Sequence, residues 1–307
     1  MMDDERRRIY LCKGYMNDHR LDFESVIYYH IGKCGGTTLI NLLSRSGSAK
    51  RSLRLHGPLY KEEGDYEDSV SSFKNFLLNL DIINKSRKDF IYGHLPYGIE
   101  GFLERDFFSI TSLRNPIERT LSDYSFGIDR GLFSRSDSIE ELIDRNRLVT
   151  NMMCRQLGGL DLFFSECSDK HLDRALNNLQ TKINLVFDSS AFLEALKVLI
   201  SVFNLPSFLF QNFNITSRKC VLSERELQII KDNNKYDTLL YQSVFVDRKV
   251  IINFDEIYQK DQLNEGNDIL FVSPYLRVNG KHWNLLGNKC VEKLVAKINR
   301  SGLHLIK

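Results

Sequence analysis

The segment from His30 to Leu39, HIGKCGGTTL, combines residue types that bind anions. It follows an apolar, strand-like run and leads into a helical pattern. Its two adjacent glycines allow a tight turn with inward-facing N–H groups, and the first-turn amides of the helix point to the same place. Lys33 adds a positive charge, and the threonines at 37 and 38 add hydroxyl donors. We therefore expect this turn to hold a phosphate-like group.

A second candidate segment is SITSLRNPIERTLSDYSF, residues 109–126. Arg114 ends an apolar strand pattern, and its planar guanidinium can bind a phosphate through two hydrogen bonds. Asn115 is a favoured N-cap, and the proline after it suits the first helical position. Arg119 and Ser122 are three residues apart, so they share one face of that helix. An alternative stays open, in which Arg114 pairs with a nearby carboxylate and Ser122 is a plain helix residue.

The elements that must position these residues alternate between strand and helix patterns. Strands are expected at Val26–Ile31, Asp89–Tyr92, Phe107–Leu113 and Ile183–Phe187. Helices are expected at Thr37–Ser44, Val70–Asn84, from Asn115 onward, Ile139–Leu157, Lys170–Leu179, Ala191–Phe203, Ser223–Asn233 and Lys235–Val246. This alternation predicts a three-layer α/β fold, a parallel sheet with helices on both faces. Ligands of such sheets bind beyond the carboxyl ends of the strands, where Lys33, His94 and Arg114 all fall.

Composition limits the function classes. The chain has 307 residues, 42% hydrophobic, and a net charge of +2, so it can bury a sizeable core but predicts no broad basic face for nucleic acid. Six cysteines without a C-x-x-C pair favour neither a zinc site nor a disulfide scaffold, and they fit a reducing compartment. No metal is expected.

We divide the chain into three parts: a charged N-terminal extension at 1–23, a main domain at 24–263 and a C-terminal strand–helix extension at 264–307. The last part holds an expected strand at Asp268–Ser273 and an expected helix at Trp283–Ile298. The residues at 45–68 are rich in serine, glycine and charge, and predict a loop. No signal peptide and no run of about 18 apolar residues is present, so we expect a cytoplasmic protein without a membrane span.

Together the two candidate segments resemble sulfotransferases that use 3′-phosphoadenosine 5′-phosphosulfate (PAPS). HIGKCGGTTL is similar to their 5′-phosphosulfate loop, and LRNPIERTLSDYSF to their 3′-phosphate motif, an arginine followed eight residues later by a serine. The resemblance is to the carbohydrate branch that includes heparan sulfate 2-O- and 6-O-sulfotransferases. It runs from about residue 24 to 245 and includes the stretches GHLPYG, NMMCRQLGG and NNKYDTLLY. It implies a P-loop-like nucleotide-binding fold.

The resemblance also implies roles for single residues. Lys33 would stabilise charge on the leaving phosphate, and Arg114 and Ser122 would bind the 3′-phosphate. His94 would be the general base; the 2-O branch has a His-Gly-His stretch where this chain reads Tyr92-Gly93-His94. The residues expected to bind the cofactor are Lys33, Cys34, Gly35, Gly36, Thr37, Thr38, Arg114, Ser122 and Arg218. Those expected to face the acceptor or the cofactor are Asn151, Arg155 and Gln156, unless they form a polar helix face that only secures a loop.

The sequence thus predicts sulfuryl transfer from PAPS to a hydroxyl, with a carbohydrate acceptor implied by the resemblance alone. Two alternatives stay open. One is a nucleotide-binding protein without catalysis, favoured by the change at Tyr92. The other is an ATP-dependent kinase, which the position of Lys33 before the two glycines disfavours, because a Walker A motif places its lysine after them. The sequence fixes neither the acceptor nor the oligomeric state.

Overall fold

The computed structural model describes fourteen stretches of the chain. They are residues 8–12, 15–16, 25–45, 52–55, 90–103, 106–163, 165–203, 207–211, 222–253, 264–265, 270–272, 277–278, 281–282 and 304–306. The expected helices at Val70–Asn84 and Trp283–Ile298 lie outside these residues, as does Arg218. No helix within the described stretches is long and apolar enough to cross a membrane.

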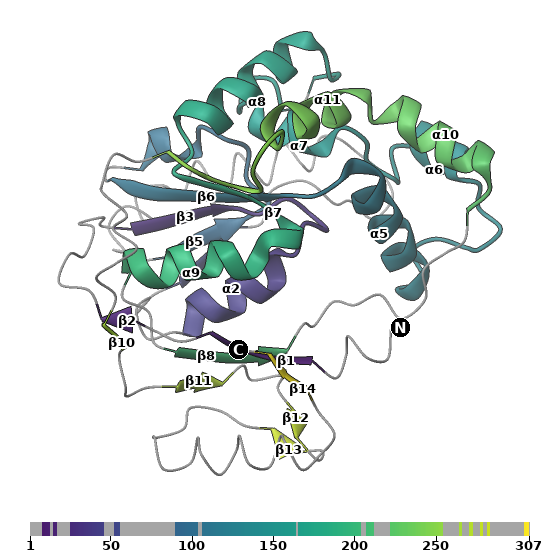
Figure 1. The fold of residues 1–307 in the computed structure, drawn as a ribbon. Coiled ribbons are helices and arrows are strands. Elements are labelled where there is room, and N and C mark those ends of the chain that lie inside the picture. The colour runs from purple at the N-terminus through teal and green to yellow at the C-terminus, as the bar shows by residue number, and fades with distance from the viewer. Residues whose placement is uncertain are drawn as a thin grey trace.

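The core of the fold is a six-stranded sheet in the order β4-β5-β3-β6-β7-β9 (Figure 1). Its strands are β3 (Ser25–Tyr29), β4 (Ser52–Leu55), β5 (Phe90–Gly93), β6 (Phe107–Leu113), β7 (Leu185–Asp188) and β9 (Val250–Ile252). The first five are parallel, and β9 runs antiparallel to β7 at one edge. The expected α/β fold is confirmed. The loop expected at 45–68 is wrong in part, because β4 forms the other edge there.

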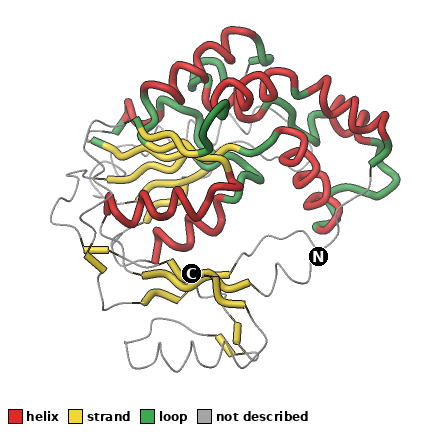
Figure 2. Tube along the Cα trace, in the orientation of Figure 1, coloured by secondary structure: helices red, strands yellow, loops and turns green. Residues whose placement is uncertain are grey.

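Helices cover both faces of this sheet, and the two-residue period of the strands explains why (Figure 2). On one face, Tyr28, Phe90 and Phe108 pack against α2 and α9, while on the other Ile27 and Ile91 pack against α7, α8 and α11. The bounds are α2 (Gly36–Arg45), α7 (Met152–Leu157), α8 (Asp169–Thr181), α9 (Phe192–Phe203) and α11 (Lys235–Val244). Strands that are apolar on both faces need helices on both sides of the sheet.

A smaller cluster joins α5 (Pro116–Asp129), α6 (Ile139–Asp144) and α10 (Glu224–Asn233) beside the sheet. The Asn115 side chain caps α5 by accepting from the amides of Ile117 and Glu118, with proline at the first helical position, as expected. The single helix expected at 139–157 is wrong. It is two helices, α6 and α7, because the backbone at Asn146 and Asn151 takes left-handed φ values of 54° and 49°.

Short strands form a second sheet in the order β11-β8-β1-β14, and β1 contacts α9. Its strands are β1 (Arg8–Cys12), β8 (Ser207–Gln211), β11 (Leu270–Val272) and β14 (His304–Ile306). The remaining short elements are β2 (Tyr15–Met16), β10 (Asn264–Glu265), β12 (Arg277–Val278), β13 (Lys281–His282), η1 (Ile99–Phe102) and η2 (Ser189–Ala191). This sheet combines β1 from the expected N-terminal extension, β8 from the expected main domain, and β11 and β14 from the expected C-terminal extension. The division at 23 and 263 stays a prediction.

Candidate active site

The glycine turn lies at the carboxyl end of β3 and leads directly into α2. Lys33 and Gly35 have left-handed φ values of 68° and 81°, so the chain reverses direction within four residues. The Cys34 amide closes the turn by donating to the carbonyl oxygen of Ile31 over 3.3 Å. At Gly35 the turn borders the end of β7, since a Cβ there would lie 3.7 Å from the Cβ of Ser189.

Gly36 brings the backbone against a buried ring. A Cβ at this position would lie 2.2 Å from Cδ2 of His30 and 2.5 Å from the Tyr28 hydroxyl. Tyr28 is fully buried in β3, and the His30 ring stacks on both Tyr28 and His94, so neither can move aside easily. Only glycine fits, and the first turn of α2 therefore starts in direct contact with His30.

Lys33 extends from the turn toward α5. Its Nζ lies 3.9 Å from the ring centroid of Phe126, and the guanidinium of Arg130 lies 5.3 Å from the same centroid. Burial lowers the pKa of the Lys33 ammonium; the Asp123 carboxylate opposes this, and the guanidinium groups nearby add to it. Gathered positive charge of this kind is unfavourable until an anion is bound among it.

Arg114 joins the second motif to the turn. Its Nη1 donates to the carbonyl oxygen of Lys33 over 3.3 Å, while its Nε pairs with Glu118 at 3.2 Å. The carboxylate pairing that the sequence left open is thus present, but it is exposed and worth about 1 kcal/mol at most. Ser122 is half-buried on α5, one helical turn before the Phe126 ring that contacts Lys33. The structure therefore brings Lys33 and Arg114 into contact and places Ser122 on the helix beside them.

His94 stands at the end of β5, next to the end of β3. The parallel register pairs Tyr28 with Tyr92 and Tyr29 with Gly93, so the next step sets His30 beside His94. Their rings stack with centroids 4.6 Å apart, and Nδ1 of His94 lies 2.8 Å from the His30 carbonyl oxygen. A carbonyl only accepts, so Nδ1 is the donor. The lone pair of the neutral ring then lies on Nε2.

The His30 ring contacts both the glycine turn and His94. Burial lowers its pKa to about 3, and the charges of His94, Arg54 and Lys33 act in the same direction. The ring is therefore neutral at ordinary pH, and it lies between Gly36 and His94. The missed signal was that strand parity puts residues 28, 30, 92 and 94 on one face, although only the register shows which of them touch.

Gln156 reaches the same place from α7, on the opposite face of the sheet. Its side chain is fully buried, and Nε2 donates to the carbonyl oxygens of Leu95 at 2.8 Å and His30 at 3.2 Å. From the sequence, Gln156 is expected to face the acceptor or the cofactor, or to belong to a polar helix face that only secures a loop. The structure shows its amide bound to the backbone on both sides of the candidate base.

Asn151 has a different environment. Its Oδ1 accepts from the amides of Tyr236 and Asp237 at 3.0 and 3.1 Å, and its Nδ2 donates to the Asn233 carbonyl oxygen at 2.7 Å. These bonds satisfy the start of α11. The side chain secures a helix junction, which is the alternative that the sequence left open; a contact with substrate remains only a prediction.

Asp237 completes this junction from the other side. Its carboxylate is fully buried and accepts from the amides of Met153 at 3.1 Å and Cys154 at 2.8 Å, at the start of α7. Burial raises the pKa of this carboxyl, and the backbone hydrogen bonds and the charge of Arg119 oppose the rise. α7 and α11 thus cap each other, which fixes the position of Gln156.

The remaining predicted residues are placed as follows. The Cys34 side chain packs in the apolar core, where burial raises its pKa to about 12, so only its backbone lies in the turn. Thr37 and Thr38 are half-buried in the first turn of α2. Arg155 is half-buried on α7, with its Nε lacking a hydrogen-bond partner among the described residues. Tyr92 stacks on Phe90 with ring centroids 5.0 Å apart, so it serves the core.

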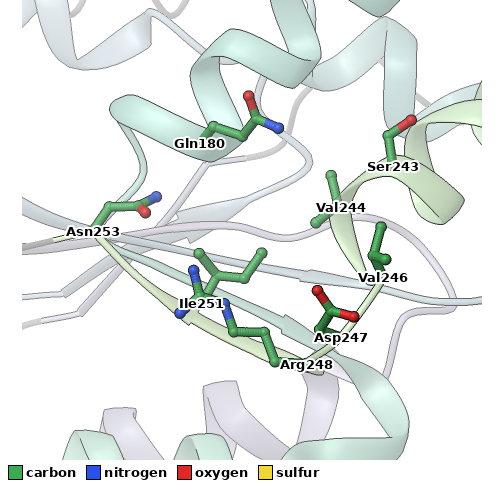
Figure 3. Close-up of a pocket in the computed structure, with 8 residues that line it drawn as sticks. All are labelled: Gln180, Ser243, Val244, Val246, Asp247, Arg248, Ile251 and Asn253. Carbon is green, nitrogen blue, oxygen red and sulfur yellow. The ribbon is translucent and has the colours of Figure 1, made fainter.

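The structure also has a pocket away from the predicted site. A pocket of about 350 Å³ lies along the edge strand β9, lined by Gln180, Ser243, Val244, Val246, Asp247, Arg248, Ile251 and Asn253 (Figure 3). None of the predicted site residues lines it. Within the described residues, no group of three or more His, Cys, Asp or Glu side chains is arranged to bind a metal ion.

Comparisons with known proteins give a likeness in structure. No family model matches the chain, and the curated proteins searched hold no match. Among solved structures, mouse sulfotransferase SULT7A1 complexed with PAP is similar, with 13% identity, 72% of this chain and 68% of that chain covered, and a TM-score of 0.34. The functional argument therefore depends on the site itself.

Proposed function

We propose that the chain transfers a sulfuryl group from PAPS to a hydroxyl, with His94 as general base. The observation that carries this proposal is the contact between the two motifs, in which Arg114 donates to the carbonyl oxygen of Lys33. One end of the sheet then offers cations for two separate phosphate groups, as a 3′,5′-bisphosphate nucleotide requires. His94 stands at the neighbouring strand end.

The residues present fit such a donor. The backbone amides at the N-terminus of α2 would bind the leaving 5′-phosphate, and Lys33, in the same turn, would stabilise the charge that this phosphate gains. Arg114 and Ser122 supply donors for the 3′-phosphate. In the displacement, the acceptor oxygen bonds to sulfur, the sulfur–oxygen bond to the 5′-phosphate breaks, and Nε2 of His94 takes the hydroxyl proton.

The acceptor is proposed to be a carbohydrate. This part is supported by the resemblance of the two motifs to the heparan sulfate branch, and by Arg130 at the end of α5, which suits an anionic sugar. A cytoplasmic location is likewise proposed, because six cysteines without a C-x-x-C pair fit a reducing compartment.

Calorimetry tests the donor site first. We expect 3′,5′-adenosine bisphosphate to bind and ATP–Mg²⁺ to bind far more weakly, and Arg114→Ala to weaken bisphosphate binding by about 10–100-fold, since a charged hydrogen bond is worth about 1.5–3 kcal/mol. Arg174→Ala is the matched control, because Arg174 pairs with Asp161 on the surface at 2.6 Å. Tight ATP–Mg²⁺ binding with no bisphosphate binding would favour the kinase alternative.

A transfer assay then separates catalysis from binding alone. With labelled PAPS and a panel of sugars and non-sugar alcohols, we expect label to move to sugar hydroxyls. Bisphosphate binding without transfer to any hydroxyl would identify a nucleotide-binding protein without catalysis.

A further inference from the structure

The buried side-chain amide of Gln156 joins the ends of β3 and β5, next to the candidate base His94. Gln156 donates through Nε2 to the His30 carbonyl at the end of β3, and to the Leu95 carbonyl directly after His94. The backbone carbonyl oxygen of Gln156 accepts from the backbone amide of Tyr97 at 2.8 Å. The segment from His94 to Tyr97 is therefore held to α7 by both the side chain and the backbone of one residue.

The orientation of this amide follows from its partners. Both partners are carbonyl oxygens, which only accept, so Nε2 must face them and Oε1 must face away. Oε1 is then buried without a hydrogen-bond partner among the described residues, which costs about 1–3 kcal/mol. A residue that only filled space would be better as methionine or leucine, so the donated hydrogen bonds are the reason to keep glutamine here.

The His30 carbonyl decides which nitrogen of His94 is basic. It accepts the Nδ1 proton at 2.8 Å and so selects the tautomer whose lone pair is on Nε2. The position of this oxygen therefore matters more than the His30 ring. Gln156 is the side chain that holds this oxygen from α7.

We propose that Gln156 is a positioning residue for His94: it fixes the His30 carbonyl, which keeps the His94 proton on Nδ1 and the lone pair on Nε2. The catalytic meaning of this rests on the proposed function. When Nε2 takes the acceptor proton, the imidazolium keeps its Nδ1–H bonded to the same carbonyl. The proton returns to solvent from Nε2 after transfer, so the ring is restored.

Nitrogen NMR on protein labelled in histidine tests the tautomer without any need for turnover. In the wild-type protein, we expect neutral His94 to carry its proton on Nδ1. A neutral His94 protonated on Nε2 would overturn the inference even if sulfuryl transfer is observed.

The variant Gln156→Met removes the donors while keeping a similar shape. We expect a mixture of His94 tautomers and a kcat about 10–100-fold lower, with the KM for the donor unchanged, because a displaced base affects the transfer step alone. The matched control is Asn253→Leu, since Nδ2 of Asn253 also donates to two carbonyl oxygens, those of Leu179 and Ile183, at 2.7 and 2.8 Å. It should lose similar stability but keep the His94 tautomer.

The outcomes separate the two proposals. An unchanged tautomer and a kcat within twofold in Gln156→Met would overturn the role of Gln156. A tautomer that is lost in Gln156→Met but kept in Asn253→Leu supports that role, even if no sulfuryl transfer is found and the proposed function fails. If Gln156→Met does not fold, the tautomer of His94 in the wild-type protein tests the proposal. A proton on Nε2 overturns it, and a proton on Nδ1 supports it.

Discussion

The carboxyl end of the sheet and the junction between α7 and α11 both bury polar side chains, but they use them differently. At the junction, the amide of Asn151 and the carboxylate of Asp237 bind backbone groups that the helix starts leave unsatisfied. At the sheet end, the carbonyl oxygen of His30 accepts from Nδ1 of His94, so this hydrogen bond orients a side chain instead of completing a helix end. The polar side chains of the junction satisfy the backbone, whereas at the sheet end the backbone positions a polar side chain.

The strongest test of this comparison is His94→Ala. Loss of the proposed general base should lower kcat by about 10²–10⁴-fold while the affinity for 3′,5′-adenosine bisphosphate stays nearly unchanged. Calorimetry and the transfer assay on the same preparation measure both. Lost nucleotide binding with normal turnover of the bound fraction would show that His94 belongs to the donor site instead.

The opposite pattern is expected at the junction. Asp237→Ala leaves the amides of Met153 and Cys154 without their acceptor, so the free energy of unfolding should fall by about 2–5 kcal/mol in urea titrations. Turnover per folded molecule should fall far less than in His94→Ala, because Asp237 acts on His94 only through the position of Gln156. The control is Asp161→Ala, at an exposed carboxylate, which should change stability little. Equal effects at Asp161 and Asp237 would contradict the capping role.

Gly36→Ala tests how closely the donor turn and the base are connected. The added methyl group would meet the His30 ring and the Tyr28 hydroxyl, so we expect about 1–3 kcal/mol of destabilisation and reduced turnover. Gly101→Ala is the matched control, because a Cβ at Gly101 meets nothing within 4 Å. Thermal unfolding of both variants measures the difference, and indistinguishable melting temperatures would show that the His30 ring can yield.

The smallest expected effect is a difference in the sign of pH dependence. Folded His30, with a pKa of about 3, binds fewer protons than the unfolded chain below pH 6.5, so its contribution to stability falls as pH falls, by up to about 1.4 kcal/mol per unit. Asp237 has a raised pKa, so its contribution falls as pH rises above the ordinary carboxyl value. Urea titrations of His30→Gln between pH 7 and 5 should show a shallower slope than wild type. If the free energy of unfolding of His30→Gln changes with pH as steeply as that of the wild-type protein, the lowered pKa of His30 is contradicted.

The sequence predicted those features that local patterns determine. The strand at Phe107–Leu113 and the cap at Asn115 were correct, because apolar runs and capping chemistry are local. The helix at 139–157 was wrong, because two asparagines in left-handed conformations break it and the pattern does not show them. The edge strands β4 and β9 were missed, since short strands depend on their partners more than on their own residues.

The site was predictable to the same extent. The turn and Arg114 follow from composition at strand ends, but the stacking of His30 on His94 depends on the register between β3 and β5. Asn151 and Gln156 lie in one sequence block, and their separate tasks depend on which neighbouring element each of them meets. Such contacts between distant segments cannot be read from spacing.

Lys33 shows what this arrangement implies for selection. A left-handed φ of 68° is unfavourable for lysine by about 1 kcal/mol or more, and glycine would adopt it without strain. The contacts of its ammonium with Phe126 and of its carbonyl with Arg114 hold the strained backbone in place. A chain selected for stability alone would carry glycine at this position. Under the proposed function, lysine at this position exchanges some stability for a positive charge inside the turn.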